Sequence, residues 1–148
     1  MKEIFIISND IDEIIKKTDK IVEKLNDVFP LDEAKLENEE VYTKIDSFIF
    51  RVSKLQDLLG AKFFKYTLIE LLEYEDNMSM IDILNKLEQL GILEKKEWIR
   101  YRNLRNFLTH IYPNDTYEIE ENLKEAIKMY DDLKIIYNRL KNRVFDEA

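Results

Sequence analysis

Residues 115–144 read DTYEIEENLKEAIKMYDDLKIIYNRLKNRV and decide the fold. Apolar side chains recur in this segment at steps of three and four residues: Ile119, Leu123, Ala126, Tyr130, Leu133, Tyr137, Leu140 and Val144. This spacing places them on one face of a long amphipathic helix. One such helix cannot bury its own apolar face, so it must pack against others.

Two earlier segments carry the same pattern. The first predicted helix covers roughly residues 9–28, with apolar positions at Ile11, Ile14, Thr18, Ile21, Leu25 and Val28. The second begins at about Glu39, with Val41, Ile45, Phe48, Val52, Leu55 and Leu59. Three long stripes predict an all-α fold, an up-and-down bundle of about four to five main helices in a single domain, residues 1–148.

Polar and glycine residues predict where these helices start and stop. Asn9 and Asp12 resemble an N-cap and its partner, and Leu31 to Asn38 resembles a polar connection. Gly60 either kinks or ends the second helix, with Ala61 to Glu73 continuing. The stretch Glu3 to Ile7 fits either an extended arm or an early helical turn. Downstream, we expect a Ser79–Asp82 capping box, a short helix ending at Gly91, a helix from Glu94 to Ile111, and a last helix opened by Asp115 and Glu118.

Composition supports helices and excludes several kinds of site. The chain has two glycines and two prolines, too few for the turns of a β protein or for a glycine-rich phosphate loop. It has no cysteine, and His110 is its single histidine, so neither a thiolate nor a paired-histidine zinc site can form. We find no signal peptide and no apolar run of the roughly 18 residues that a membrane span needs. A cytoplasmic protein without membrane partners is therefore expected.

The net charge of −8 argues against broad, nonspecific binding to nucleic acid. Contact with RNA would require the positive charge to be concentrated in one place. The most basic stretch lies around Trp98–Pro113 and carries Lys95, Lys96, Arg100, Arg102 and Arg105. That stretch is the candidate chemical site.

A helical projection of this stretch makes Arg105 unusual. It falls, with Tyr112, inside an apolar face formed by Trp98, Tyr101, Leu104, Leu108 and Ile111. A guanidinium there is costly unless it is paired, so Arg105 should lie in a cleft, line an interface or meet an acid such as Asp46 or Asp57. Arg102, Asn106 and His110 form a separate stripe, in which Arg102 is either a second phosphate contact or a solvated side chain.

Arg105 and His110 are five residues apart, so they diverge by about 140° on one straight helix. They can converge if the helix end loosens before Pro113. They can also converge across a two-fold axis, with each subunit contributing to a shared cleft. The second arrangement predicts a homodimer.

The segment Arg105-Asn106-Phe107-Leu108-Thr109-His110-Ile111-Tyr112 resembles the R-x4-H-x-Y motif of HEPN-domain proteins. It looks most like the HepT-type toxins of two-gene nucleotidyltransferase–HEPN toxin–antitoxin modules. The resemblance covers the bundle architecture from about Asn9 to Leu140, and in sequence detail mainly Trp98 to Pro113.

The resemblance implies a ribonuclease that needs no metal or cofactor and works as a homodimer with the motif at the subunit interface. It implies that His110 transfers protons, that Arg105 stabilises charge on the phosphate, and that Asn106 orients the histidine or the RNA. Tyr112 matches the position that a partner nucleotidyltransferase, the antitoxin, modifies with AMP. Arg102 is a candidate additional RNA contact.

Two other interpretations stay open. One is a non-catalytic HEPN protein that binds a partner nucleotidyltransferase. The other is a purely structural bundle in which Arg105 forms a salt bridge with a neighbouring acid.

Overall fold

The computed structural model describes residues 2–110 and 116–146, and every regular element in that part of the chain is helical. The elements are α1 (Lys2–Asn26), α2 (Glu33–Glu37), α3 (Glu39–Leu58), the π-helical turn η1 (Leu59–Phe63), α4 (Phe64–Glu70), α5 (Met80–Gln89), α6 (Lys95–Thr109), α7 (Thr116–Lys141) and the π-helical turn η2 (Asn142–Asp146). The predicted all-α fold is confirmed.

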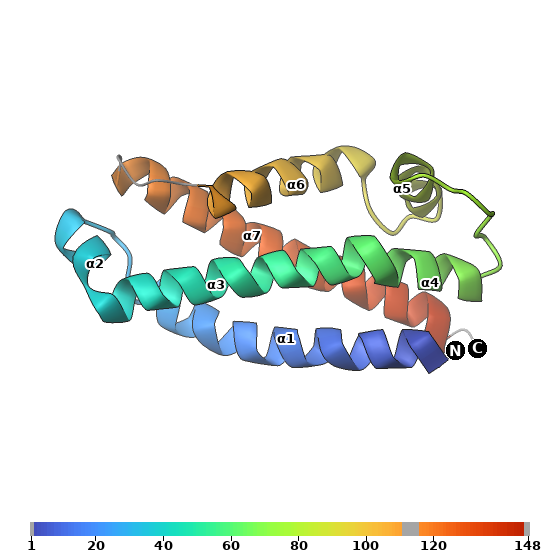
Figure 1. The fold of residues 1–148 in the computed structure, drawn as a ribbon, viewed down its shortest axis with the longest axis horizontal. Coiled ribbons are helices and arrows are strands. Elements are labelled where there is room, and N and C mark those ends of the chain that lie inside the picture. Colours follow the sequence, from blue (N-terminus) through green and yellow to red (C-terminus); the bar gives the residue numbers. More distant parts are fainter. Residues whose placement is uncertain (1, 111–115, 147–148) are drawn as a thin grey trace.

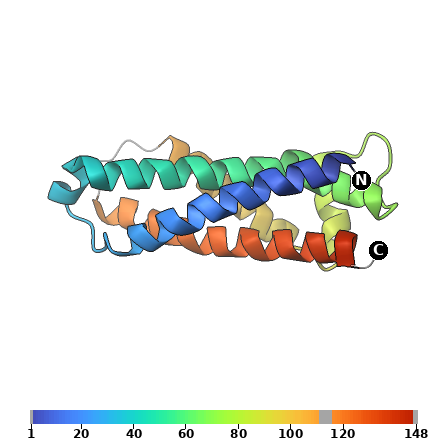
Figure 2. The same ribbon diagram turned by 90° about the horizontal axis from the view of Figure 1, so that it is seen from below.

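The long helices α1, α3, α6 and α7 alternate in direction, as in an up-and-down bundle (Figure 1). Helix α3 lies between α1 and α6, and α4 continues its course beyond η1. The short helices α2 and α5 lie at opposite ends of the bundle. Figure 2 shows α1 crossing between α3 and α7, with the two chain ends at the same end of the molecule.

Two buried tyrosines of α7 form hydrogen bonds with α1. Tyr130 and Tyr137 are at most 2% exposed. The Tyr137 hydroxyl donates to Asp12 Oδ1 at 2.6 Å, and the Tyr130 hydroxyl donates to Asp19 Oδ1 at 2.6 Å. Since both the tyrosines and the aspartates are two helical turns apart, the pairs fix the register of α7 against α1.

The same two rings also contact α3 and η1. Tyr137 meets the ring of Phe63 edge-on, with centroids 5.2 Å apart, and Tyr130 meets Phe48 at 6.4 Å. Edge-to-face pairs of this kind add to the free energy that burial of the rings contributes. Each tyrosine therefore joins three parts of the bundle.

The structure corrects two predictions in the first part of the chain. Helix α1 begins at Lys2, so Glu3 to Ile7 is helical and Asn9 is an exposed residue within the helix rather than its cap. The reason is that Ile4 and Ile7 continue the apolar stripe and are buried. The predicted polar connection from Leu31 to Asn38 contains α2.

Helix α2 forms because its first turn is capped locally. The Asp32 side chain accepts a hydrogen bond from the Lys35 amide at 2.8 Å. The Lys35 ammonium in turn donates to the carbonyl oxygens of Val28 and Pro30, at 2.8 and 2.7 Å. These bonds satisfy backbone groups that a helix end and a loop would otherwise leave to water.

The helix boundaries later in the chain are largely as predicted. Ser79 and Asp82 form a reciprocal capping box at the start of α5. Gly91 follows α5 with a φ of 74°, a conformation that glycine adopts without steric cost. Helix α6 ends at Thr109, and the predicted boundary residues Ile111 and Asp115 lie outside the described residues. In the described ranges, no helix combines the length and the apolar character needed to cross a bilayer.

The Tyr137→Phe substitution tests the tyrosine–carboxylate pairs. It leaves Asp12 and the partner hydroxyl of Ser8, which lies 2.7 Å from the phenol oxygen, without this contact. We expect the free energy of unfolding to fall by about 1 to 2 kcal/mol in urea denaturation. Tyr42→Phe, on a ring that is 43% exposed, is the control and should change little. Equal effects would show that the pairs do not stabilise the bundle.

Alkaline pH should also weaken the bundle. Burial, together with hydrogen bonds to Asp12 and Asp19, raises the pKa values of Tyr137 and Tyr130 far above that of a free phenol. The unfolded chain releases these protons near pH 10, so this contribution to stability is complete below about pH 10 and is lost as pH rises above it. Urea denaturation at rising pH should therefore show falling stability, less steeply in Tyr137→Phe. A parallel decline in both proteins would contradict this assignment.

Candidate functional site

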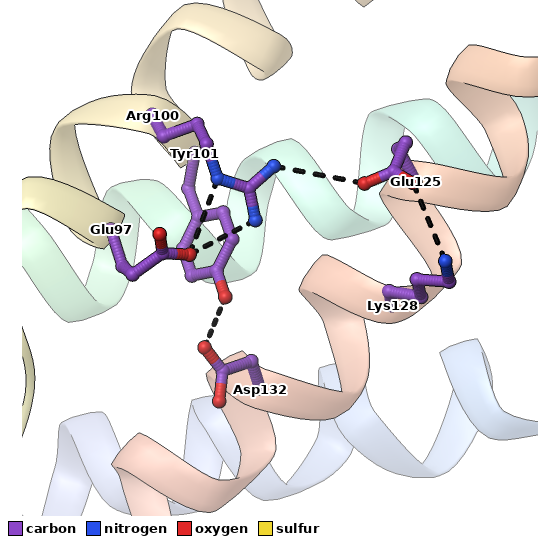
Figure 3. Close-up of polar contacts among 6 residues, drawn as sticks. All are labelled: Glu97, Arg100, Tyr101, Glu125, Lys128 and Asp132. Atoms are coloured by element: carbon purple, nitrogen blue, oxygen red, sulfur yellow. Dashed lines mark hydrogen bonds and ion pairs between the residues drawn. The ribbon is translucent and has the colours of Figure 1, made fainter.

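Polar contacts to α7 fix the rotation of α6, which carries the candidate motif. The Tyr101 hydroxyl donates to Asp132 of α7, and Arg100 pairs with Glu97 at 3.0 Å and with Glu125 at 3.6 Å (Figure 3). The bond to Glu97 is the main cause of a raised pKa of Arg100. Together with buried Trp98, these contacts turn the Arg105 side of α6 toward α3.

Arg105 meets one of the two acids considered from the sequence. Its Nη2 lies 3.0 Å from Asp57 Oδ2 on α3, and its Nη1 lies 3.5 Å from Asn106 Oδ1. The Arg105 side chain is 31% exposed and that of Asp57 is 53% exposed, so water screens the pair. Asp46, the other candidate, instead lines a separate apolar groove with Tyr42 and Leu108.

A groove of about 230 Å³ separates α3 from α6 beside this ion pair. Its lining residues come from η1, α3, α5 and α6: Gln56, Asp57, Gly60, Ala61, Met80, Trp98, Arg102 and Arg105. Gly60 allows the helices to approach, because a Cβ at this position would lie 3.0 Å from Cζ2 of Trp98. The irregularity that the sequence predicts at Gly60 is the π-helical turn η1, in which Gly60 packs closely against Trp98.

Gln56 is a member of this groove that the sequence interpretation missed. It is 4% exposed, yet neither its amide nitrogen nor its amide oxygen has a hydrogen-bond partner. The signal in the sequence was a polar residue directly after Leu55 in an otherwise apolar stripe. Arg102, which is exposed, and Arg105, whose Nε also lacks a partner, share the groove with it.

The rest of the motif lies exposed at the end of α6. Asn106, Thr109 and His110 are all exposed, and the Thr109 hydroxyl donates to the carbonyl oxygens of Arg105 and Asn106 within its own helix. His110 ends the helix, with its amide donating to the Phe107 carbonyl oxygen at 3.1 Å. Tyr112, the candidate modification site, lies outside the described residues.

Arg105 and His110 have different surroundings in the described chain, since Arg105 meets Asp57 of α3 and His110 is exposed at the end of α6. Among residues 2–110 and 116–146, no hydrogen bond or ion pair joins them, and His110 lies beyond the last residue of α6 while Arg105 faces α3. The alternative of a loosened helix end before Pro113 depends on residues 111–113, which lie outside the described residues.

A second polar groove lies on the other side of α3, against α1. It measures about 410 Å³, and four cations line it: Lys17, Arg51, Lys54 and Lys62. Two acids, Asp10 and Glu13, share the groove with them. Cations thus outnumber acids here, in a protein that is acidic as a whole. The sequence did not reveal this cluster because Lys17 is far from the others along the chain.

In the described part of the chain, no cluster of three or more histidine, aspartate or glutamate side chains could hold a metal ion. In comparisons with known proteins, no family model, no curated protein and no solved structure matches this chain.

Asp57→Asn tests whether the ion pair with Arg105 is structural. Because both side chains are partly exposed, we expect the free energy of unfolding to change by less than about 1 kcal/mol in urea denaturation. A loss well above 2 kcal/mol, roughly what an uncompensated buried charge costs, would show that Arg105 serves the fold. The control is Glu125→Gln, which removes one carboxylate from Arg100 on the other side of α6.

Proposed function

We propose that this chain is a metal-independent endoribonuclease, the toxin of a nucleotidyltransferase–HEPN toxin–antitoxin pair, and that it acts as a homodimer. One observation carries the proposal. The polar residues of the R-x4-H-x-Y motif that the structure describes are directed to solvent or to a groove, and both Asn106 and His110 are exposed on α6 and its C-cap. Their exposure leaves them accessible to a substrate.

The chemistry uses groups that RNA itself supplies. The 2′-oxygen attacks the adjacent phosphorus, the bond from phosphorus to the 5′-oxygen breaks, and a cyclic phosphate and a 5′-hydroxyl result. His110 takes or gives the proton that moves in this step, since imidazole exchanges protons near neutral pH. Arg105 donates hydrogen bonds to the charged phosphate oxygens, and Asn106 orients the RNA or the histidine.

A homodimer would bring Arg105 and His110 into one shared site. A two-fold axis beside α6 would set the arginine of one subunit near the histidine of the other. Exposed apolar side chains are available for such an interface, since Phe107 of α6 is 40% exposed and Phe50 of α3 is 67% exposed. Tyr112 follows His110 in sequence, so AMP added there by the partner nucleotidyltransferase would block RNA by bulk and charge.

RNA also needs positive charge to bind, and two sets of side chains supply it. Arg102 and Arg105 lie in the groove between α3 and α6. The cations of the α1–α3 groove lie on the opposite flank of α3. An RNA backbone that crosses α3 would meet both sets, although the protein is acidic overall.

The ion pair favours a second candidate function. Asp57 occupies the guanidinium of Arg105, as expected if this arginine supports a surface rather than a reaction. A non-catalytic protein that binds a partner nucleotidyltransferase would have this arrangement. It would form a complex that His110→Ala leaves intact.

The decisive experiment is RNA cleavage by purified protein with a chelator present. We expect the wild type to cleave and His110→Ala to lose at least about a hundredfold in rate, as is usual when a general acid or base is removed. Asn103→Ala, at another exposed position of α6, is the matched control and should cleave like the wild type.

The protein used must be dimeric and free of AMP on Tyr112, as mass spectrometry can establish. Absence of cleavage under these conditions would reject the ribonuclease and favour the binding partner. Equal cleavage by wild type and His110→Ala would remove His110 from the reaction.

A further inference from the structure

The groove between α3 and α6 contains a buried amide that the fold leaves unsatisfied. Gln56 is 4% exposed, and both polar atoms of its side chain are shielded from solvent and lack a hydrogen-bond partner. Burying such a group unpaired is unfavourable, so unpaired groups in folded proteins are few. An apolar residue of similar size would avoid this cost, which suggests that the amide has another role.

We infer that this groove is a nucleobase-binding subsite, in which the Gln56 amide forms hydrogen bonds with the edge of a base next to the cleaved phosphate. This inference rests on the proposed ribonuclease function for the identity of the ligand as RNA. It adds a residue that determines which nucleotide is accepted.

The chemistry of the groove matches a base. The amide of Gln56 offers one acceptor beside one donor group, and base edges offer the complementary pair, as adenine does at N7 and N6. Trp98 and Met80 provide apolar lining for a planar ring. The volume of about 230 Å³ is smaller than the roughly 300 Å³ or more of pockets that enclose drug-sized ligands, and it suits a ring fragment.

The adjoining arginines match the phosphate that a base carries with it. Arg102 and Arg105 line the same groove, and Arg105 Nε has no partner, while its Nη2 contacts Asp57. A base held by Gln56 would therefore bring its phosphate to Arg105. Since the amide atoms are shielded, the base must displace a flexible side chain, and the exposed Arg102 and the thioether of Met80 are suited to move.

A bound water could satisfy Gln56 instead, and α3 provides a control for that explanation. Ser53 is also buried, at 8% exposed, and its hydroxyl also lacks a partner, but it does not line the groove. If unpaired groups on α3 serve only to hold water, substitution of Ser53 or of Gln56 should leave the base preference in RNA binding unchanged. A base-binding role singles out Gln56.

The test is a binding titration in the His110→Ala background, so that RNA stays intact. The probes are short oligo(A), oligo(C) and oligo(U), and an abasic oligoribonucleotide of the same length and charge. Trp98 lines the groove and is the single tryptophan in the sequence, so its fluorescence reports directly on the occupied site. We expect one base to bind about tenfold more tightly than the abasic oligomer, as one good amide–base contact allows.

The substitution Gln56→Leu should remove this preference, whereas Ser53→Ala should retain it. Gln56→Leu should also keep or raise the stability toward urea, because it removes an unpaired buried amide. Equal affinity for the abasic oligomer, an unchanged preference in Gln56→Leu, or absence of binding would each overturn the subsite.

The titration and the cleavage assay can fail separately. If the wild type cleaves RNA but Gln56→Leu binds like its parent, the ribonuclease stands and the subsite is wrong. If the base preference depends on Gln56 but the wild type does not cleave, the subsite stands and the catalytic proposal is wrong.

Discussion

The two tyrosine–aspartate contacts between α7 and α1 set the frame on which the other helices depend. Tyr137 with Asp12 and Tyr130 with Asp19 favour one alignment of the two longest helices, because a shift of either helix would leave a buried phenol without these acceptors. Their rings also contact Phe63 and the helix before it. Apolar packing brings these helices together, and the polar tips of buried residues define how they align.

Helix α6 is held against this frame by its own set of contacts. The bond from Tyr101 to Asp132 and the packing of Trp98 over Gly60 fix which side of α6 faces α3. That orientation directs Arg105 into a groove and leaves His110 at the exposed helix end. In the proposed function a second subunit completes the site, so dimerisation and activity are linked.

The distribution of charge bears on the same proposal. The protein carries a net charge of −8, yet grooves on both flanks of α3 gather cations. The acidic charge on the rest of the protein would limit nonspecific attraction to nucleic acid, so that RNA would bind at the two cationic grooves beside α3. The ion pair of Arg105 with Asp57 would weaken the binding of RNA at this position, because a phosphate has to compete with a carboxylate for the guanidinium.

Local patterns in the sequence determined the helices, the capping box at Ser79, the turn at Gly91 and the candidate motif, since spacing and capping depend on residues a few positions apart. Tertiary structure alone decided that Asp57 rather than Asp46 pairs with Arg105, that Gln56 lies unpaired in the same groove, and that Lys17 joins the cations of α3. Tertiary structure also decided that α1 begins at Lys2, because packing in the bundle buries Ile4 and Ile7 on the helix face. Contacts between residues far apart in the chain follow from how helices rotate and align, which periodicity within one helix does not specify.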